Sequence, residues 1–288
     1  MSKSKNHHYI PQWLMKFWAD SNEKVRVVDR RKSPEVRAYT PNVRNVNSQN
    51  YLYSIKDDNG EYDDSLERNL YSPLDNEAHK LTLEIIDILK SGKIPDLEVN
   101  ARSQFWQFHF YNAVKRYPNS FDKYMEDADI ETLVEEEVKL SIQNGENPIE
   151  VSAPNNIQKI KSRIQALGVR YARADQNTEV LEHFSKMGII FGIAPEGTSF
   201  VLPDKAFNLQ NANDSNNHEK SIWIPIHPSY AVSMSGFDGK CSLKHLSKSQ
   251  VRKINEEWYS YSNTIISTSE ELLKSLVKRH EGKKITFT

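Results

Sequence analysis

One stretch, residues 98–116, sets the strongest constraint on the fold. Its aromatic side chains are Phe105, Trp106, Phe108, Phe110 and Tyr111. A helix over these residues is apolar almost all the way round, and such helices lie at the centre of a protein with other elements on every side. Pro118 follows and ends the helix. With 288 residues, 38% of them hydrophobic, the chain is long enough to bury such a helix.

The order of the predicted elements gives the fold class. Alternating and β-rich runs predict strands at 24–29, 50–55, 188–193, 199–202, 222–226, 230–234 and 264–267, with a loop or edge strand at 34–41. Apolar spacings of three and four predict helices at 66–89, 121–143, 157–174, 178–186, from 247 onward and at 269–279. We therefore expect an α+β protein: short N-terminal strands, a central helical bundle with one buried aromatic helix, then antiparallel strands and a closing helix.

We expect a single domain over residues 1–288. Its sub-regions are a β part at 1–60, a helical part at 61–186, and a β-then-α part at 187–288. Residues 57–60 predict a turn, Pro73 a break in the first helix, and residues 209–220 a polar loop. Residues 268–271 resemble a helix N-cap.

Composition narrows the function classes. The net charge of −1 gives no basic field that would attract nucleic acid, although a local basic patch is compatible with it. One cysteine, Cys241, excludes an internal disulfide and a four-cysteine zinc site, and we interpret it as structural. P-loop, dinucleotide-binding, HExxH and GxSxG motifs are absent. The polar first residues and short apolar runs favour a cytoplasmic protein without membrane contact.

The run Asn6-His7-His8-Tyr9-Ile10-Pro11-Gln12 is the first candidate site. Adjacent histidines on a strand point in opposite directions, so one can face a site while the other packs or orients it. Imidazoles are suited to acid–base chemistry and to metal binding. His7 and His8 are therefore candidate catalytic residues, with Tyr9 and Gln12 as substrate-binding residues. The alternative is that the pair only packs.

Two further regions complete the candidate site. At helical spacing Arg102, His109 and Arg116 share a face and suit a phosphate, and Gln107 belongs to a neighbouring polar face. His109 is a candidate catalytic residue, although a buried histidine with a hydrogen-bond partner is the more ordinary interpretation. Asp204, at the end of a predicted strand, is either a catalytic carboxylate or a turn former.

The chain resembles the bacterial and fungal domain-of-unknown-function family 4238. The opening His7-His8-Tyr9-Ile10-Pro11-Gln12 with Leu14 and Phe17 is like that family's HHYxPxxxLxxF motif. Weaker ordered matches follow at 25–30, 66–67, 200–204, 222–228 and 254–255. Two positions depart from the family pattern: Leu202-Pro203 stands in place of Thr-Ser, and Asp75 in place of a glutamate. The resemblance implies no established activity, and a defence nuclease or toxin is the role it suggests.

Three functions follow as hypotheses. The first is a histidine-dependent phosphodiesterase or nuclease, in anti-phage defence or as a toxin, with nucleic acid as substrate and a divalent metal as its candidate cofactor. The second is a non-enzymatic binding or sensor module with a protein partner, in which the N-terminal motif is a structural latch. The third is a small-molecule nucleotide hydrolase that uses the same residues.

Overall fold

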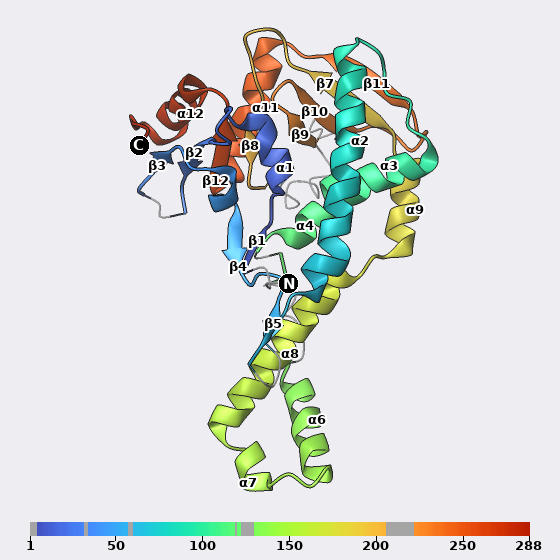
Figure 1. Ribbon diagram of the computed structural model, residues 1–288, viewed down its shortest axis with the longest axis vertical. Helices are drawn as coiled ribbons and strands as arrows, with labels where there is room; N and C mark the ends of the chain where they lie inside the picture. The colour runs from blue at the N-terminus through green and yellow to red at the C-terminus, as the bar shows by residue number, and fades with distance from the viewer. Residues whose placement is uncertain (1–4, 32–33, 57–59, 119, 122–129, 206–221) are drawn as a thin grey trace, which may run out of the picture. The chain divides into compact units, whose positions relative to one another are not determined.

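The structure, a computed structural model, describes residues 5–31, 34–56, 60–118, 120–121, 130–205 and 222–288 (Figure 1). The predicted α+β class is confirmed, with N-terminal strands, central helices, C-terminal strands and a closing helix. The chain forms two compact units. Unit 1 comprises Met1–His7, Gln49–Pro73 and Val114–Gln176, and unit 2 comprises His8–Ser48, Leu74–Ala113 and Asn177–Thr288. The predicted loop at 209–220 and most of the predicted turn at 57–60 lie outside the described residues.

Unit 2 contains two four-stranded sheets. Sheet A has the order β11-β7-β10-β9, with β7 at Ile189–Ile193, β9 at Trp223–His227, β10 at Tyr230–Met234 and β11 at Cys241–His245. β10 pairs antiparallel with β7 and β9, whereas β11 runs parallel to β7. The antiparallel strands were predicted. β11 was not, because it is largely exposed and carries little apolar patterning.

Sheet A is covered on both faces because its strands alternate. Ile189, Phe191 and Val232 belong to a core shared with α2 (Ser72–Lys90), α3 (Val99–Trp106) and α9 (Thr178–Lys186). Ile190 and Ala231 are the strand neighbours of these residues and therefore face the other side of the sheet. They pack in a second core with α11 (Lys248–Tyr261) and α12 (Glu270–Glu281). This alternation is the ordinary period of a strand.

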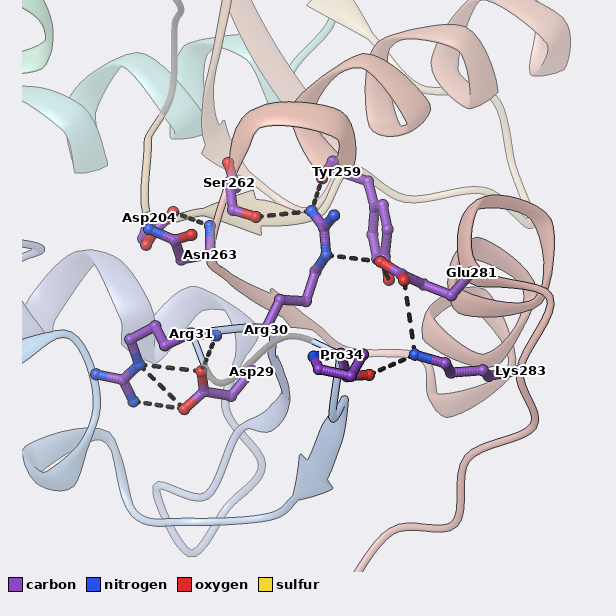
Figure 2. A network of polar contacts seen from close by, with 10 residues as sticks. All are labelled: Asp29, Arg30, Arg31, Pro34, Asp204, Tyr259, Ser262, Asn263, Glu281 and Lys283. Carbon is purple, nitrogen blue, oxygen red and sulfur yellow. Dashed lines mark hydrogen bonds and ion pairs between the residues drawn. The ribbon is translucent and has the colours of Figure 1, made fainter.

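Sheet B, also in unit 2, has the order β3-β2-β12-β8 and is antiparallel throughout. Its strands are β2 (Arg26–Asp29), β3 (Arg37–Tyr39), β8 (Leu202–Pro203) and β12 (Thr264–Ser267). β3 is at the edge, as its flanking prolines predict. Figure 2 shows how Arg30, just after β2, bonds the Ser262 carbonyl oxygen at 2.9 Å and Glu281 at 3.0 Å. This guanidinium ties sheet B to the ends of α11 and α12.

The helix boundaries follow local signals. Ser247 and Gln250 form a capping box at the start of α11, and Ser269 caps α12 through the Leu272 N–H. The predicted break at Pro73 is wrong, because the chain stays helical through this position: a π-helical segment at Glu67–Tyr71 leads directly into α2 at Ser72. The wider π-helical turn before Pro73 accommodates a residue that has no backbone N–H.

The aromatic helix is buried, as predicted. Phe105 and Trp106 of α3 are 1% and 0% exposed. The helix continues through a π-helical segment, Gln107–Asn112, into α4 (Ala113–Arg116). A π-helix has more residues per turn than an α-helix, so positions after it no longer follow the helical spacing that the sequence suggested.

Unit 1 combines short strands with a helical hairpin. β1 (Asn6–His8) pairs with β4 (Ser48–Asn50), and β5 (Ile55–Lys56) pairs with β6 (Tyr62–Asp63). The continuous strand predicted at 50–55 is wrong, because Tyr51 has a positive φ of 57° and the chain turns there. α6 (Ile130–Gln143) and α8 (Pro154–Ala174) lie side by side, with α7 (Pro148–Val151) at the tip of the hairpin (Figure 1).

Candidate functional site

The first histidine of the N-terminal motif is built into unit 1. His7 lies in β1 and is 1% exposed. Its Nδ1 accepts a hydrogen bond from the Tyr53 N–H at 3.0 Å, and the two rings stack with centroids 5.3 Å apart. Because Nδ1 accepts this bond, the proton of the neutral imidazole is on Nε2. His7 thus fixes both the backbone and the ring of Tyr53.

Tyr53 lies among aromatic rings and guanidinium groups. Its ring centroid is 4.6 Å from that of Tyr71, and the Arg173 guanidinium lies 5.3 Å from it. Arg116, predicted to bind substrate, is 2% exposed and lies over the Tyr71 ring at 4.3 Å. Burial raises the pKa of Tyr53 well above 10, so its phenol stays protonated and donates to the Arg116 carbonyl oxygen at 3.3 Å.

Tyr53 forms part of the wall of a cavity in unit 1. The cavity has a volume of about 500 Å³. Its lining residues are Leu52, Tyr53, Ser54, Ile55, Leu66, Pro118, Gln165, Ala166, Val169, Arg170 and Arg173. Small-molecule sites have volumes of roughly 300–1,000 Å³ and combine apolar walls with a few polar groups. This cavity has both the size and the mixed wall of a ligand site.

The polar groups of the cavity come from two segments. On α8, Arg173 is 3% exposed and donates to the carbonyl oxygens of Leu52 and Pro118. Arg170 on the same helix pairs with Asp63 at 2.7 Å. On the opposite segment the Ser54 hydroxyl is buried and has no hydrogen-bond partner within the part of the chain that the structure describes. An unpartnered buried hydroxyl in a cavity wall is a ready contact for a ligand.

From His8 onward the motif belongs to unit 2. The His8 imidazole is partly exposed and lies between two hydrogen bonds: Nε2 to the Arg44 carbonyl oxygen at 3.1 Å, and Nδ1 to the Gln12 amide at 3.4 Å. Tyr9 is 7% exposed and its hydroxyl donates to Asn47 at 3.3 Å. Gln12 therefore orients His8, while Tyr9 packs inside unit 2.

His109 is buried in unit 2 and 4% exposed. Its Nε2 is 3.0 Å from the Thr82 hydroxyl, and its ring contacts those of Phe105 and Phe108. Burial lowers its pKa to about 3, so the imidazole is neutral at neutral pH. The space beside it, which Gln107 also lines, measures about 20 Å³, enough for roughly one water molecule.

The predicted face of Arg102, His109 and Arg116 is divided between different environments. The Arg102 guanidinium donates to the carbonyl oxygens of Leu97, at 2.5 Å, and Ser185, at 3.1 Å. His109 contacts Thr82, while Arg116 belongs to unit 1 and donates to the Tyr71 carbonyl oxygen at 3.2 Å. The described contacts therefore do not assemble these three residues around one phosphate.

Asp204 follows β8 in unit 2 and is 6% exposed. Its Oδ1 accepts from the Asn263 N–H at 3.0 Å, as Figure 2 shows. Burial raises its pKa to about 6, even though backbone hydrogen bonds act in the other direction. The described partner of the carboxylate is thus a backbone N–H group at the turn before β12, and not an imidazole.

The described residues contain no group of three or more His, Cys, Asp or Glu side chains arranged to hold a metal ion. No described helix is long and apolar enough to cross a membrane.

Four cavity residues were missed in the sequence: Tyr53, Ser54, Arg170 and Arg173. They come from segments more than a hundred positions apart, and no motif joins them. The only local signal was the spacing of Arg170 and Arg173, three residues apart and hence on one side of a helix.

Comparison with known protein families identifies the family of the chain. The profile of the family described as "Protein of unknown function (DUF4238)" matches residues 6–271, which confirms the expected resemblance. No curated protein matches the chain significantly, and neither does any solved structure.

Proposed function

We propose that the chain, which belongs to the DUF4238 family of proteins of unknown function, is a ligand-binding module whose site is the cavity of unit 1. The observation that carries this proposal is the cavity itself, about 500 Å³ in volume, with an apolar wall that also holds Arg170 and the unpartnered Ser54 hydroxyl. Its size suits a ligand of metabolite or nucleotide dimensions.

The N-terminal motif supports this proposal as a structural latch. His7 contacts Tyr53 through both a hydrogen bond and a ring stack, and Tyr53 is a wall residue. A buried imidazole that accepts from a backbone N–H holds a binding wall in one conformation. Preorganisation of this kind lowers the entropy lost when a ligand binds.

Filling the cavity tests the proposal. Ala166 lines the cavity, so Ala166→Trp is expected to occupy it and to abolish binding of small molecules that wild type retains. Ala174 is an exposed residue of the same helix outside the cavity, and Ala174→Trp is the matched control. Ligand-observed NMR with a fragment library measures binding. Fragments that bind all three proteins alike, or none of them, would remove the support for this site.

Histidine-dependent phosphodiesterase chemistry is the second proposal, and His8 is the observation that favours it. Its imidazole is partly exposed, and Nε2 donates to the Arg44 carbonyl oxygen, which leaves Nδ1 as the basic nitrogen. The Gln12 amide lies 3.4 Å from Nδ1, and it has to turn aside for Nδ1 to act as a general base. Purified protein is expected to cleave RNA, DNA or nucleotides with Mg²⁺ or Mn²⁺, and His8→Ala to lose at least a hundredfold in rate. Intact substrates under all conditions, with chelator as the control, would contradict this chemistry and leave the binding module.

A further inference from the structure

The two arginines of the cavity wall, Arg170 and Arg173, differ in their hydrogen bonds. The hydrogen bonds of Arg170 to described residues all use Nη2, which donates to Ser65 Oγ at 2.6 Å and pairs with Asp63 Oδ2 at 2.7 Å. The N–H groups on Nε and Nη1 therefore make no hydrogen bond within the described ranges. The side chain is 28% exposed and lines the cavity, so these donors remain accessible to a ligand.

Asp63, the counter-ion of Arg170, lies in β6 outside the cavity wall and its side chain is 39% exposed. It has a second partner, Ser65, whose N–H donates to Oδ1 at 2.8 Å and whose hydroxyl lies 3.2 Å from Oδ2. Although burial acts to raise it, the pKa of Asp63 is lowered by its hydrogen bonds from Ser65 and Arg170. Asp63 stays ionised and hydrogen-bonded to Ser65 when Arg170 turns away.

The ion pair between Arg170 and Asp63 is easily exchanged. A solvent-exposed pair contributes little net free energy, because water stabilises both charges when they separate. A guanidinium, in contrast, binds a carboxylate or a phosphate through two parallel hydrogen bonds, and Asp63 leaves the N–H groups on Nε and Nη1 of Arg170 available for them. An anion inside the cavity therefore gives Arg170 a better-matched partner than Asp63.

We infer, building on the proposed binding function, that the ligand of the unit 1 cavity carries a carboxylate or phosphate group. This group forms an ion pair with Arg170 and replaces Asp63 as its partner. The apolar residues Leu52, Ile55 and Val169 then receive the body of the ligand, and the Ser54 hydroxyl bonds a polar group on it. No acidic residue lines the cavity, so nothing in its described wall repels an anion.

Matched pairs of small molecules test this inference. Each pair joins an anion to its neutral counterpart: benzoate with benzamide, indole-3-acetate with indole-3-acetamide, phenyl phosphate with phenol, and AMP with adenosine. Dissociation constants are measured by NMR titration for wild type, Arg170→Gln and Asp63→Asn. Lys161→Gln is the control, because it removes the same charge from α8 at a residue that pairs with Glu131 and lies outside the cavity wall.

The two variants are expected to act in opposite directions. Arg170→Gln should weaken binding of the anions at least tenfold and leave the neutral molecules unchanged, since only the charged contact is lost. Asp63→Asn should tighten anion binding several-fold, because it removes the competing counter-ion. Lys161→Gln should match wild type, and the carboxylate and phosphate pairs separate the two anion chemistries.

Failure of the inference and failure of the proposed function give different results. If both members of each pair bind with affinities that neither Arg170→Gln nor Asp63→Asn changes, while Ala166→Trp abolishes binding, the cavity is a ligand site and the anion inference is wrong. If no molecule binds wild type in a way that Ala166→Trp prevents, both are wrong. Hydrogen-exchange protection of α8 equal to that of wild type checks that each variant is folded.

Discussion

Acidification is expected to cost unit 2 roughly 4 kcal/mol of unfolding free energy between pH 6.5 and pH 3 through His109 alone, since each pKa unit corresponds to about 1.4 kcal/mol and the site is half protonated at each end of this range, in the unfolded and in the folded chain respectively. The folded-state pKa of His109 is about 3 because the ring is desolvated, against 6.5 for an exposed histidine. The unfolded chain therefore binds the proton first. The contribution of His109 is present in full above pH 6.5 and is lost as the pH falls toward 3.

His109→Gln is expected to flatten this dependence. Its carboxamide can replace Nε2 as the partner of the Thr82 hydroxyl, now 3.0 Å away, without binding a proton. Tryptophan fluorescence is the right probe, because all five tryptophans, at positions 13, 18, 106, 223 and 258, belong to unit 2. Urea unfolding from pH 4 to 7 gives the free energies. A wild type and a Gln variant with parallel pH profiles would contradict the assignment.

Asp204 and His227, also in unit 2, contribute to the pH dependence between pH 4 and pH 7. Asp204 acts with the opposite sign: its folded pKa of about 6 lies above the ordinary 3.8, so its folded form binds the proton first and stability falls as the pH rises from about 4 to 6. His227, with a pKa lowered to about 4 by burial, has the same sign as His109. Asp204→Asn is therefore the internal control, since it should steepen the loss of stability on acidification.

Sequence reasoning identified those parts of the fold that local physics determines. The strands at β2, β7, β9 and β10 carry enough β-branched and aromatic residues to be recognised. The N-cap of α12 at Ser269, predicted at residues 268–271, acts within one turn of the chain and was recognised for that reason. β11 was not predicted, because its pairing with β7 depends on tertiary contacts and not on its own composition.

The candidate site was predictable only in part, for the same reason. The N-terminal motif was singled out as a candidate site, and the structure holds His7 against Tyr53, a residue of the cavity wall. The residue that His7 contacts was not predictable, because Tyr53 is forty-six positions away in the sequence. The alignment of Arg102, His109 and Arg116 assumed a regular α-helix, and the π-helical segment at Gln107–Asn112 breaks that regularity.

Replacing His7 by alanine is expected to destabilise unit 1 by about 2–4 kcal/mol. The buried Tyr53 N–H would lose its acceptor at 3.0 Å, which costs roughly 1–3 kcal/mol, and the loss of the ring stack adds about 1 kcal/mol. Ligand binding in the cavity should weaken as well, because Tyr53 would no longer be fixed in the wall. Hydrogen-exchange mass spectrometry on peptides covering residues 49–56 measures the change, since no tryptophan reports on unit 1.

His7→Asn separates a latch from a catalyst at this position. The Asn Oδ1 can stand where Nδ1 stands and accept from the Tyr53 N–H, but the amide does not transfer protons near neutral pH. A latch predicts that His7→Asn recovers most of the protection and binding lost in His7→Ala. A catalytic imidazole predicts instead that His7→Asn has lost its phosphodiesterase activity although it is as well protected as wild type. His8→Asn is the control, because the partly exposed His8 contacts Arg44 and Gln12 in unit 2 and should leave residues 49–56 protected.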